Sequence, residues 1–89
     1  MTTTQKHRLF VSEPIGNKSV RCLPGIGESR GSRLEQQDFN RADAVLGQFL
    51  RLNRDRGRFT NWLKDASGAS TREAGLCDQC LREWCDNNL

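Results

Sequence analysis

The sequence predicts an all-α protein, a compact five-helix domain over residues 1–89. No segment of strand length alternates apolar and polar side chains, and β-branched residues are sparse. Apolar side chains instead recur every three or four residues between helix start and stop signals. A chain of 89 residues has room for one hydrophobic core, so we expect one domain.

Proline and glycine divide the N-terminal half into short elements. A first helix is predicted from about Thr3 to Val11, and it ends before Glu13-Pro14 because proline disfavours helix in the preceding residue. A turn at residues 16–18 leads to a short helical turn near Ser19–Leu23. After a further glycine-rich turn, a second helix is predicted near Glu28–Gln37.

The C-terminal half is predicted to hold three longer helices. Asn40 is the expected N-cap of a helix that runs through Leu52. Asp55 is the expected cap of the next helix, which Gly68 ends. The pattern Ser70-Thr71-Arg72-Glu73 indicates a capping box that opens the last helix.

Cysteines could indicate a metal or redox site. Cys77 and Cys80 have the spacing of half a zinc site, but a structural zinc ion needs four ligands, and the sequence offers no second pair at similar spacing. Positions 77, 80, 81 and 84 instead follow the spacing of a buried helix face. We therefore expect these cysteines to be core residues and expect no metal or cofactor.

The charge distribution favours a polyanionic partner. Residues 1–64 carry a net charge of +6 and residues 65–89 a net charge of −3, and eleven of the fourteen basic residues are arginine. Arginine binds phosphate through a planar pair of donors. An ordinary solvated surface is the alternative.

No apolar run is long enough to span a bilayer and no signal sequence precedes the first helix, so we expect a soluble intracellular protein without membrane insertion.

The stretch from Val20 to Leu34 indicates a helix-hairpin-helix motif, at about residues 20–37. Gly25 and Gly27 permit backbone angles and a close approach that side chains would prevent, and Ile26 is expected to fill the space between the helices. Backbone N–H groups at the start of the second helix, with the positive end of its dipole, form an anion site. The alternative is a glycine turn that binds no ligand.

Three expectations follow for DNA. Arg30 and Arg33 lie within two turns of the hairpin and are expected to flank a phosphate path. Phosphate contacts carry no base information, so binding should be independent of sequence. Replacing Gly25 or Gly27 by glutamate is expected to abolish binding and to leave the helix content intact.

The whole chain resembles the barrier-to-autointegration factor family. The resemblance rests on residues 4–8, 13–16, 25–28, 45–50, 62–65 and 80–86. It implies a homodimer that bridges two DNA duplexes, links chromatin to the nuclear envelope and contributes to nuclear assembly, in the nucleus and cytoplasm. It also implies LEM-domain proteins and lamins as partners, and phosphorylation of Thr2, Thr3 and Thr4 to release DNA.

The resemblance also implies site residues. Gln5, Lys6 and Arg33 match its DNA contacts, and Arg72 is the candidate substitute for a basic contact that the family has one turn later. With the hairpin, the expected DNA-binding residues are Gln5, Lys6, Gly25, Ile26, Gly27, Arg30, Arg33 and Arg72. The expected dimer or partner surface comprises Leu46, Gly47, Leu50, Arg51, Arg58 and Trp62.

Two departures from the family bear on the partner surface. Arg51 stands where the family usually has a small apolar residue, and Arg58 stands where it has leucine. An unpaired charge in an apolar groove costs several kcal/mol, roughly the affinity of a weak interface, unless Asp43 or Asp55 pairs with it. The DNA site is therefore expected to be retained more readily than the LEM site. The alternatives are a diverged paralogue or variant that binds DNA as a monomer, or a protein-interaction module; an enzyme is disfavoured because the sequence offers no catalytic cluster.

Overall fold

The computed structural model describes the backbone of residues 5–89 and the side chains of residues 7–89. Within that range the chain forms five α-helices, one 3-10 turn and an isolated bridge, without a named strand, which confirms the all-α prediction. In chain order the elements are α1 (Gln5–Ser12), η1 (Val20–Cys22), α2 (Glu28–Glu35), α3 (Ala42–Arg51), α4 (Arg56–Ser67) and α5 (Thr71–Asn88).

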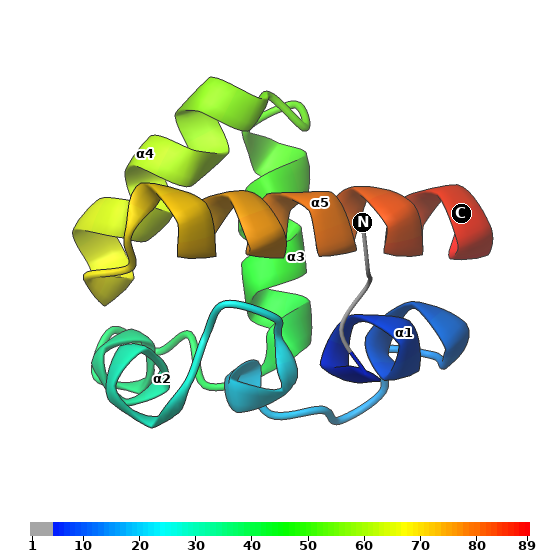
Figure 1. Cartoon of the computed structure of the whole chain (residues 1–89), viewed down its shortest axis with the longest axis horizontal. Helices are drawn as coiled ribbons and strands as arrows, with labels where there is room; N and C mark the ends of the chain where they lie inside the picture. The colour runs from blue at the N-terminus through cyan, green and yellow to red at the C-terminus, as the bar shows by residue number, and fades with distance from the viewer. Residues whose placement is uncertain (1–4) are drawn as a thin grey trace.

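The last helix organises the molecule. As Figure 1 shows, α5 crosses the full width of the view, with α4 above it and α1 and α2 below it. Helix α3 runs at a steep angle to α5. The folded part measures 28 × 26 × 24 Å. None of the described helices is long and apolar enough to cross a membrane.

Every helix contributes side chains to one core. Phe10 of α1, Leu34 of α2, Phe49 of α3 and Phe59 of α4 are each at most 1% exposed. The rings of Phe49 and Phe59 meet edge to face with their centroids 5.2 Å apart. From α5 come the side chains of its inner face, Ala74, Cys77, Cys80, Leu81, Trp84 and Cys85. The prediction that Cys77 and Cys80 belong to a buried stripe is therefore confirmed.

Three predicted helix boundaries are confirmed by their hydrogen bonds. The Asp55 carboxylate accepts from the Arg58 N–H at 2.9 Å and caps α4. Gly68 ends α4 in the left-handed region, with φ of +78°. At the start of α5, the Ser70 hydroxyl accepts from the Glu73 N–H and the Glu73 carboxylate accepts from the Ser70 N–H, which completes the capping box.

Other boundaries differ from the prediction. The N-cap of α3 is Arg41 and not Asn40, because this segment pairs with the chain before η1: the Val20 N–H donates to the Asn40 carbonyl and the Ala42 N–H to the Lys18 carbonyl. This pairing holds residue 41 extended. Helix α2 ends two residues early, at Glu35. The predicted start of the first helix at Thr3 lies outside the described residues.

Candidate nucleic-acid interface

The predicted hairpin is formed by η1, a tight turn and α2. Leu23 is extended, with φ of −72° and ψ of 131°, as expected for a residue before proline. The Ile26 N–H donates to the Leu23 carbonyl at 3.0 Å and closes the turn. Ile26 itself is fully buried in the core. The expectation that Ile26 is a buried residue of the hairpin is confirmed.

Gly25 is required by the fold. Its φ is +84°, in the region that L-residues with a side chain rarely adopt. A Cβ at this position would also overlap the carbonyl oxygen of Glu73 and lie 3.0 Å from its carbonyl carbon. The hairpin turn therefore packs directly on the backbone of the first turn of α5. The expectation that glutamate at Gly25 leaves the helices intact is wrong, because this backbone contact leaves no room for a side chain.

Gly27 is free of both constraints. It is the N-cap of α2 in an extended conformation, with φ of −104° and ψ of −157°, and it makes no side-chain capping bond. A Cβ there would meet no atom within 4 Å. The first turn of α2 thus presents its N–H groups and the positive end of its dipole beside open space. Nothing in the fold requires glycine here, whereas the close approach of an anion to this backbone would.

Helix α5 brings Arg72 to the hairpin. An open depression of about 370 Å³ is lined by Gly25, Ile26 and Gly27 of the turn and by Arg72, Glu73 and Leu76 of α5. Of these, Arg72 is exposed and extends the hairpin's positive potential with a full charge. Sequence reasoning placed Arg72 in the site and missed Glu73 and Leu76; the one-turn spacing from Arg72 to Leu76 is the signal that marks Leu76.

Arg30 has a structural contact that the sequence did not reveal. Its Nε donates to Glu73 Oε1 at 3.1 Å and its Nη2 lies at the same distance from that oxygen. The Ser70 N–H and the Arg30 guanidinium hold the pKa of Glu73 below its usual value of 4.5. Arg30 therefore ties α2 to the capping box of α5, and this pair fixes the hairpin relative to Arg72.

The other residues predicted to bind DNA either lie away from the depression or have side chains outside the described residues. Arg33 is exposed and lies over the end of α4, where its Nη1 is 2.7 Å from the position of a Cβ on Gly68. It does not line the depression. Gln5 and Lys6 belong to the first turn of α1, and their side chains lie outside the described residues. Thr2, Thr3 and Thr4 also lie outside the described part of the chain.

The predicted partner surface is only partly exposed. Gly47 and Arg51 are exposed on α3, and Leu50 beside them is 39% exposed. Leu46, by contrast, is 8% exposed and belongs to the core, so it offers little of its side chain to a partner. It lies one residue before Gly47, on the face of α3 that turns inward. Trp62 of α4 is half-buried and packs edge to face on Phe39, 5.0 Å between centroids.

The two arginines of this surface, Arg51 and Arg58, are not paired by Asp43 or Asp55. Asp43 pairs with Arg41 at 2.8 Å, and the Asp55 carboxylate is used by the N-terminal backbone of α4. Within the described residues, neither carboxylate forms an ion pair with Arg51 or Arg58. Both guanidinium groups are therefore exposed charges.

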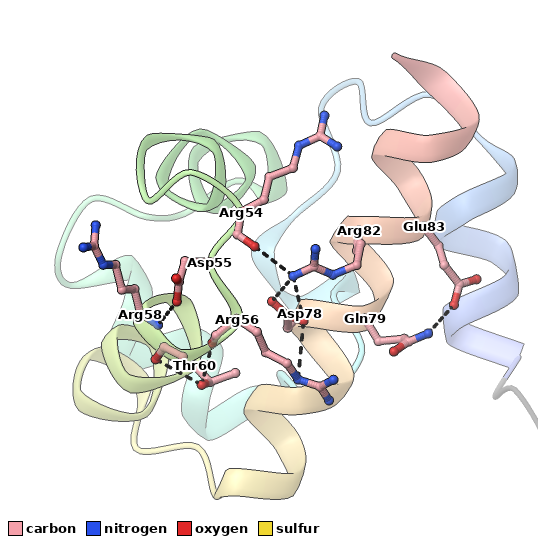
Figure 2. A network of polar contacts seen from close by, with 10 residues as sticks. Arg54, Asp55, Arg56, Arg58, Thr60, Asp78, Gln79, Arg82 and Glu83 are labelled. Carbon is pink, nitrogen blue, oxygen red and sulfur yellow. Dashed lines mark hydrogen bonds and ion pairs between the residues drawn. The ribbon is translucent and has the colours of Figure 1, made fainter.

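A buried carboxylate organises the start of α4. Asp78 of α5 is fully buried and lies 3.4 Å from Arg82 Nη2 and 3.8 Å from Arg56 Nε. Arg82 Nη2 also donates to the Arg54 carbonyl at 2.9 Å, so it connects α5 to the loop before α4 (Figure 2). The same view shows the side chains of Arg54, Arg56 and Arg58 pointing in three different directions. The arginines of residues 54–58 therefore do not form one patch.

The fold and the hairpin, in which the N-terminus of α2 has no side-chain cap, define a small helical protein of the helix-hairpin-helix class. A family model described as barrier to autointegration factor matches residues 1–88. The chain is 56% identical to barrier-to-autointegration factor of Danio rerio over 88 residues, which cover 99% of this chain and 98% of the relative. It is 55% identical to the Homo sapiens protein over 86 residues (97% of each chain) and 49% identical to that of Drosophila melanogaster over 87 residues (98% and 97%). The chain belongs to the barrier-to-autointegration factor family.

Proposed function

We propose that this protein binds double-stranded DNA without sequence specificity through the hairpin and the start of α5. We propose further that it acts as a homodimer that bridges two duplexes, links chromatin to the nuclear envelope and contributes to nuclear assembly. The main support is the uncapped N-terminus of α2 at Gly27, which faces open space beside Arg72. Membership of the family supports the same conclusion.

The chemistry of this site suits a phosphodiester. A phosphate oxygen that approaches Gly27 accepts hydrogen bonds from the first N–H groups of α2 and interacts with the positive end of its dipole. Arg72 supplies a charge and paired donors across the depression. Both contacts reach the DNA backbone and not the base edges, so they fix the position of the duplex without reading its sequence.

The fold holds these two contacts at a fixed spacing. Gly25 lets the turn rest on the Glu73 backbone, and the Arg30–Glu73 pair joins α2 to α5. A site whose parts are already in place loses less conformational entropy when it binds. Arg30 is therefore a positioning residue of the DNA site.

The test compares two variants that add the same charge. Gly27→Glu places a carboxylate at the open N-terminus of α2, whereas Asn61→Glu adds one on the exposed surface of α4. Binding of a fluorescent random-sequence duplex should weaken at least about tenfold for Gly27→Glu, since about 1.4 kcal/mol corresponds to that factor. Asn61→Glu should stay within about twofold of wild type. Equal affinities for the two variants would remove the hairpin from the mechanism.

The homodimer draws support from the outer face of α3. Leu50 is an exposed apolar side chain there, next to Gly47, which would let a second helix approach closely. Sedimentation velocity should show a free species near twice 10.1 kDa and, with a duplex of about two helical turns, two subunits with two duplexes. A monomer that binds one duplex would contradict bridging and favour the alternative, a DNA-binding monomer.

We also propose that the protein binds LEM-domain proteins and lamins, with an affinity that Arg51 and Arg58 reduce. The exposed charges of Arg51 and Arg58 would have to be desolvated or paired by any partner that covers them. Replacing both by leucine should strengthen binding of a LEM domain, measured by titration calorimetry, by about tenfold or more. Unchanged affinity would place the LEM site elsewhere.

Phosphate on Thr2, Thr3 or Thr4 should weaken DNA binding, because each adds about −1.5 to −2 charges near Lys6.

A further inference from the structure

Another cation lies beside α5, at the start of α4. We propose that Arg56 is a further phosphate contact of the DNA site, and that Gly75 of α5 is the surface on which its guanidinium rests. The inference depends on the proposed function, because it extends the path of the same duplex from the hairpin across α5. The sequence left open whether the basic stretch of residues 51–58 is an extra DNA contact, and it did not single out Arg56, since 19 positions separate it from Gly75 in the chain.

The Arg56 guanidinium lies over the α5 backbone beside Gly75. Arg56 Nη2 lies 3.7 Å from the position that a Cβ on Gly75 would occupy, and Gly75 is itself half-buried. The Arg56 side chain is 65% exposed. Its guanidinium is therefore close to the α5 backbone on one side and accessible from solvent, where a DNA phosphate would approach.

The helical geometry of α5 connects Arg56 to the hairpin. At about 100° per residue, Arg72, Gly75, Leu76 and Gln79 share one face of the helix. The hairpin meets this face on the side of Glu73 and Leu76, which line the depression. Arg56 approaches from the opposite side, where its guanidinium lies beside Gly75 and 3.8 Å from the Asp78 carboxylate. A duplex that rests on the hairpin and on Arg72 would therefore have Arg56 at its edge, across the width of one helix.

The buried carboxylate of Asp78 orients Arg56 without neutralising it. Asp78 lies near two guanidinium groups, Arg56 and Arg82, so the cluster keeps a net positive charge. Arg82 is committed to the fold, because its Nη2 also donates to the Arg54 carbonyl. Arg56 faces Asp78 through Nε, at 3.8 Å, and among residues 7–89 no hydrogen bond engages its two terminal nitrogens, which can act as a pair of donors for phosphate.

The neighbouring arginines provide the contrast. In Figure 2 the Arg56 side chain turns toward α5, whereas the Arg58 side chain points away from it. Arg54 is exposed in the loop before α4, two residues before Arg56, and belongs neither to the DNA site nor to the partner surface. Loss of either charge changes the net charge of the protein equally, so Arg54 is a matched control.

The experiment measures duplex affinity as a function of salt for wild type, Arg56→Gln and Arg54→Gln. For each protein, the logarithm of the binding constant of a random-sequence duplex is plotted against the logarithm of the salt concentration. Each phosphate contact that is lost should reduce the slope by about 0.9. We expect Arg56→Gln to weaken binding several-fold and to lose about that much slope, while Arg54→Gln keeps the wild-type slope. Circular dichroism confirms that both variants are folded at the temperature of the assay.

The outcomes separate this inference from the proposed function. If Arg56→Gln keeps the wild-type slope while Gly27→Glu loses binding, Arg56 is no contact and the hairpin site stands. If Arg56→Gln and Arg54→Gln lose the same affinity and slope, the effect is one of net charge, and the inference is overturned. If the wild-type protein binds no duplex, both fall together.

Discussion

Two glycines that look equivalent in the sequence have different roles, and alanine substitution should separate them. Gly25 supports the fold, because its backbone is left-handed and it contacts the Glu73 backbone. Gly27 supports the binding site, because it is extended and faces open space. We therefore expect Gly25→Ala to destabilise the protein strongly and Gly27→Ala to leave its stability almost unchanged.

The magnitude for Gly25→Ala follows from two contributions. Placing alanine at φ of +84° costs about 1–2 kcal/mol. The overlap of its Cβ with the Glu73 carbonyl adds about 1–3 kcal/mol, since backbone of a capped helix must move to relieve it. The total, roughly 2–5 kcal/mol, is a large part of the stability of a small domain. For Gly27→Ala neither contribution applies, and a surface change of this kind stays within about 0.5 kcal/mol.

Urea unfolding and heat unfolding, each followed by circular dichroism, measure the stability of both variants directly. A loss of roughly 2–5 kcal/mol should lower the Tm by about 10 °C or more in a domain of this size. The refuting result is a Gly25→Ala variant that unfolds at the wild-type urea concentration, or a Gly27→Ala variant as unstable as Gly25→Ala. Either would mean that the turn does not rest on α5 in the way described.

Three further predictions concern α5. The pKa of Glu73 is below 4.5, so its stabilising contribution is complete above that pH and is lost as the pH falls; the urea midpoint of Glu73→Gln should therefore change less than that of wild type between about pH 5 and about pH 3. A thiol reagent should titrate only Cys22 in the native protein and all four cysteines after unfolding, because Cys80 and its two neighbours on α5 are buried and burial raises the pKa of Cys80 to about 12; rapid reaction of a second native thiol would contradict this. Asp78→Asn should lower the unfolding free energy by about 1–3 kcal/mol, since it weakens the contacts of a buried carboxylate with two arginines; an unchanged urea midpoint would show that the network does not stabilise the fold.

Local signals predicted most of the fold. The capping box at Ser70, the cap at Asp55 and the left-handed Gly68 were all readable from a few neighbouring residues, because capping is a local interaction. The buried stripe of α5 followed from its spacing alone. The N-cap of α3 did not, because the bridge between Ser19 and Arg41 joins segments that the sequence does not show to be adjacent.

The sequence predicted the hairpin motif of the site, but it did not show which residues of the motif support the fold and which face the ligand. The hairpin pattern indicated Gly25 and Gly27 alike, and only the contact of Gly25 with Glu73 distinguishes them. The Arg30–Glu73 pair joins residues 43 positions apart, so no local pattern marks Arg30 as a positioning residue. Arg56 was obscured for the same reason, since its neighbour Gly75 comes from another helix.

The central claim is that duplex DNA lies on the hairpin and the first turns of α5. The most direct measurement follows the backbone amide resonances of isotope-labelled protein during titration with a random-sequence duplex. The largest shifts should fall at Gly25–Glu28 and Arg72–Leu76, be the same for unrelated duplex sequences, and diminish with added salt. Shifts confined to the outer face of α3, around Gly47–Arg51, with the hairpin unchanged, would contradict the claim.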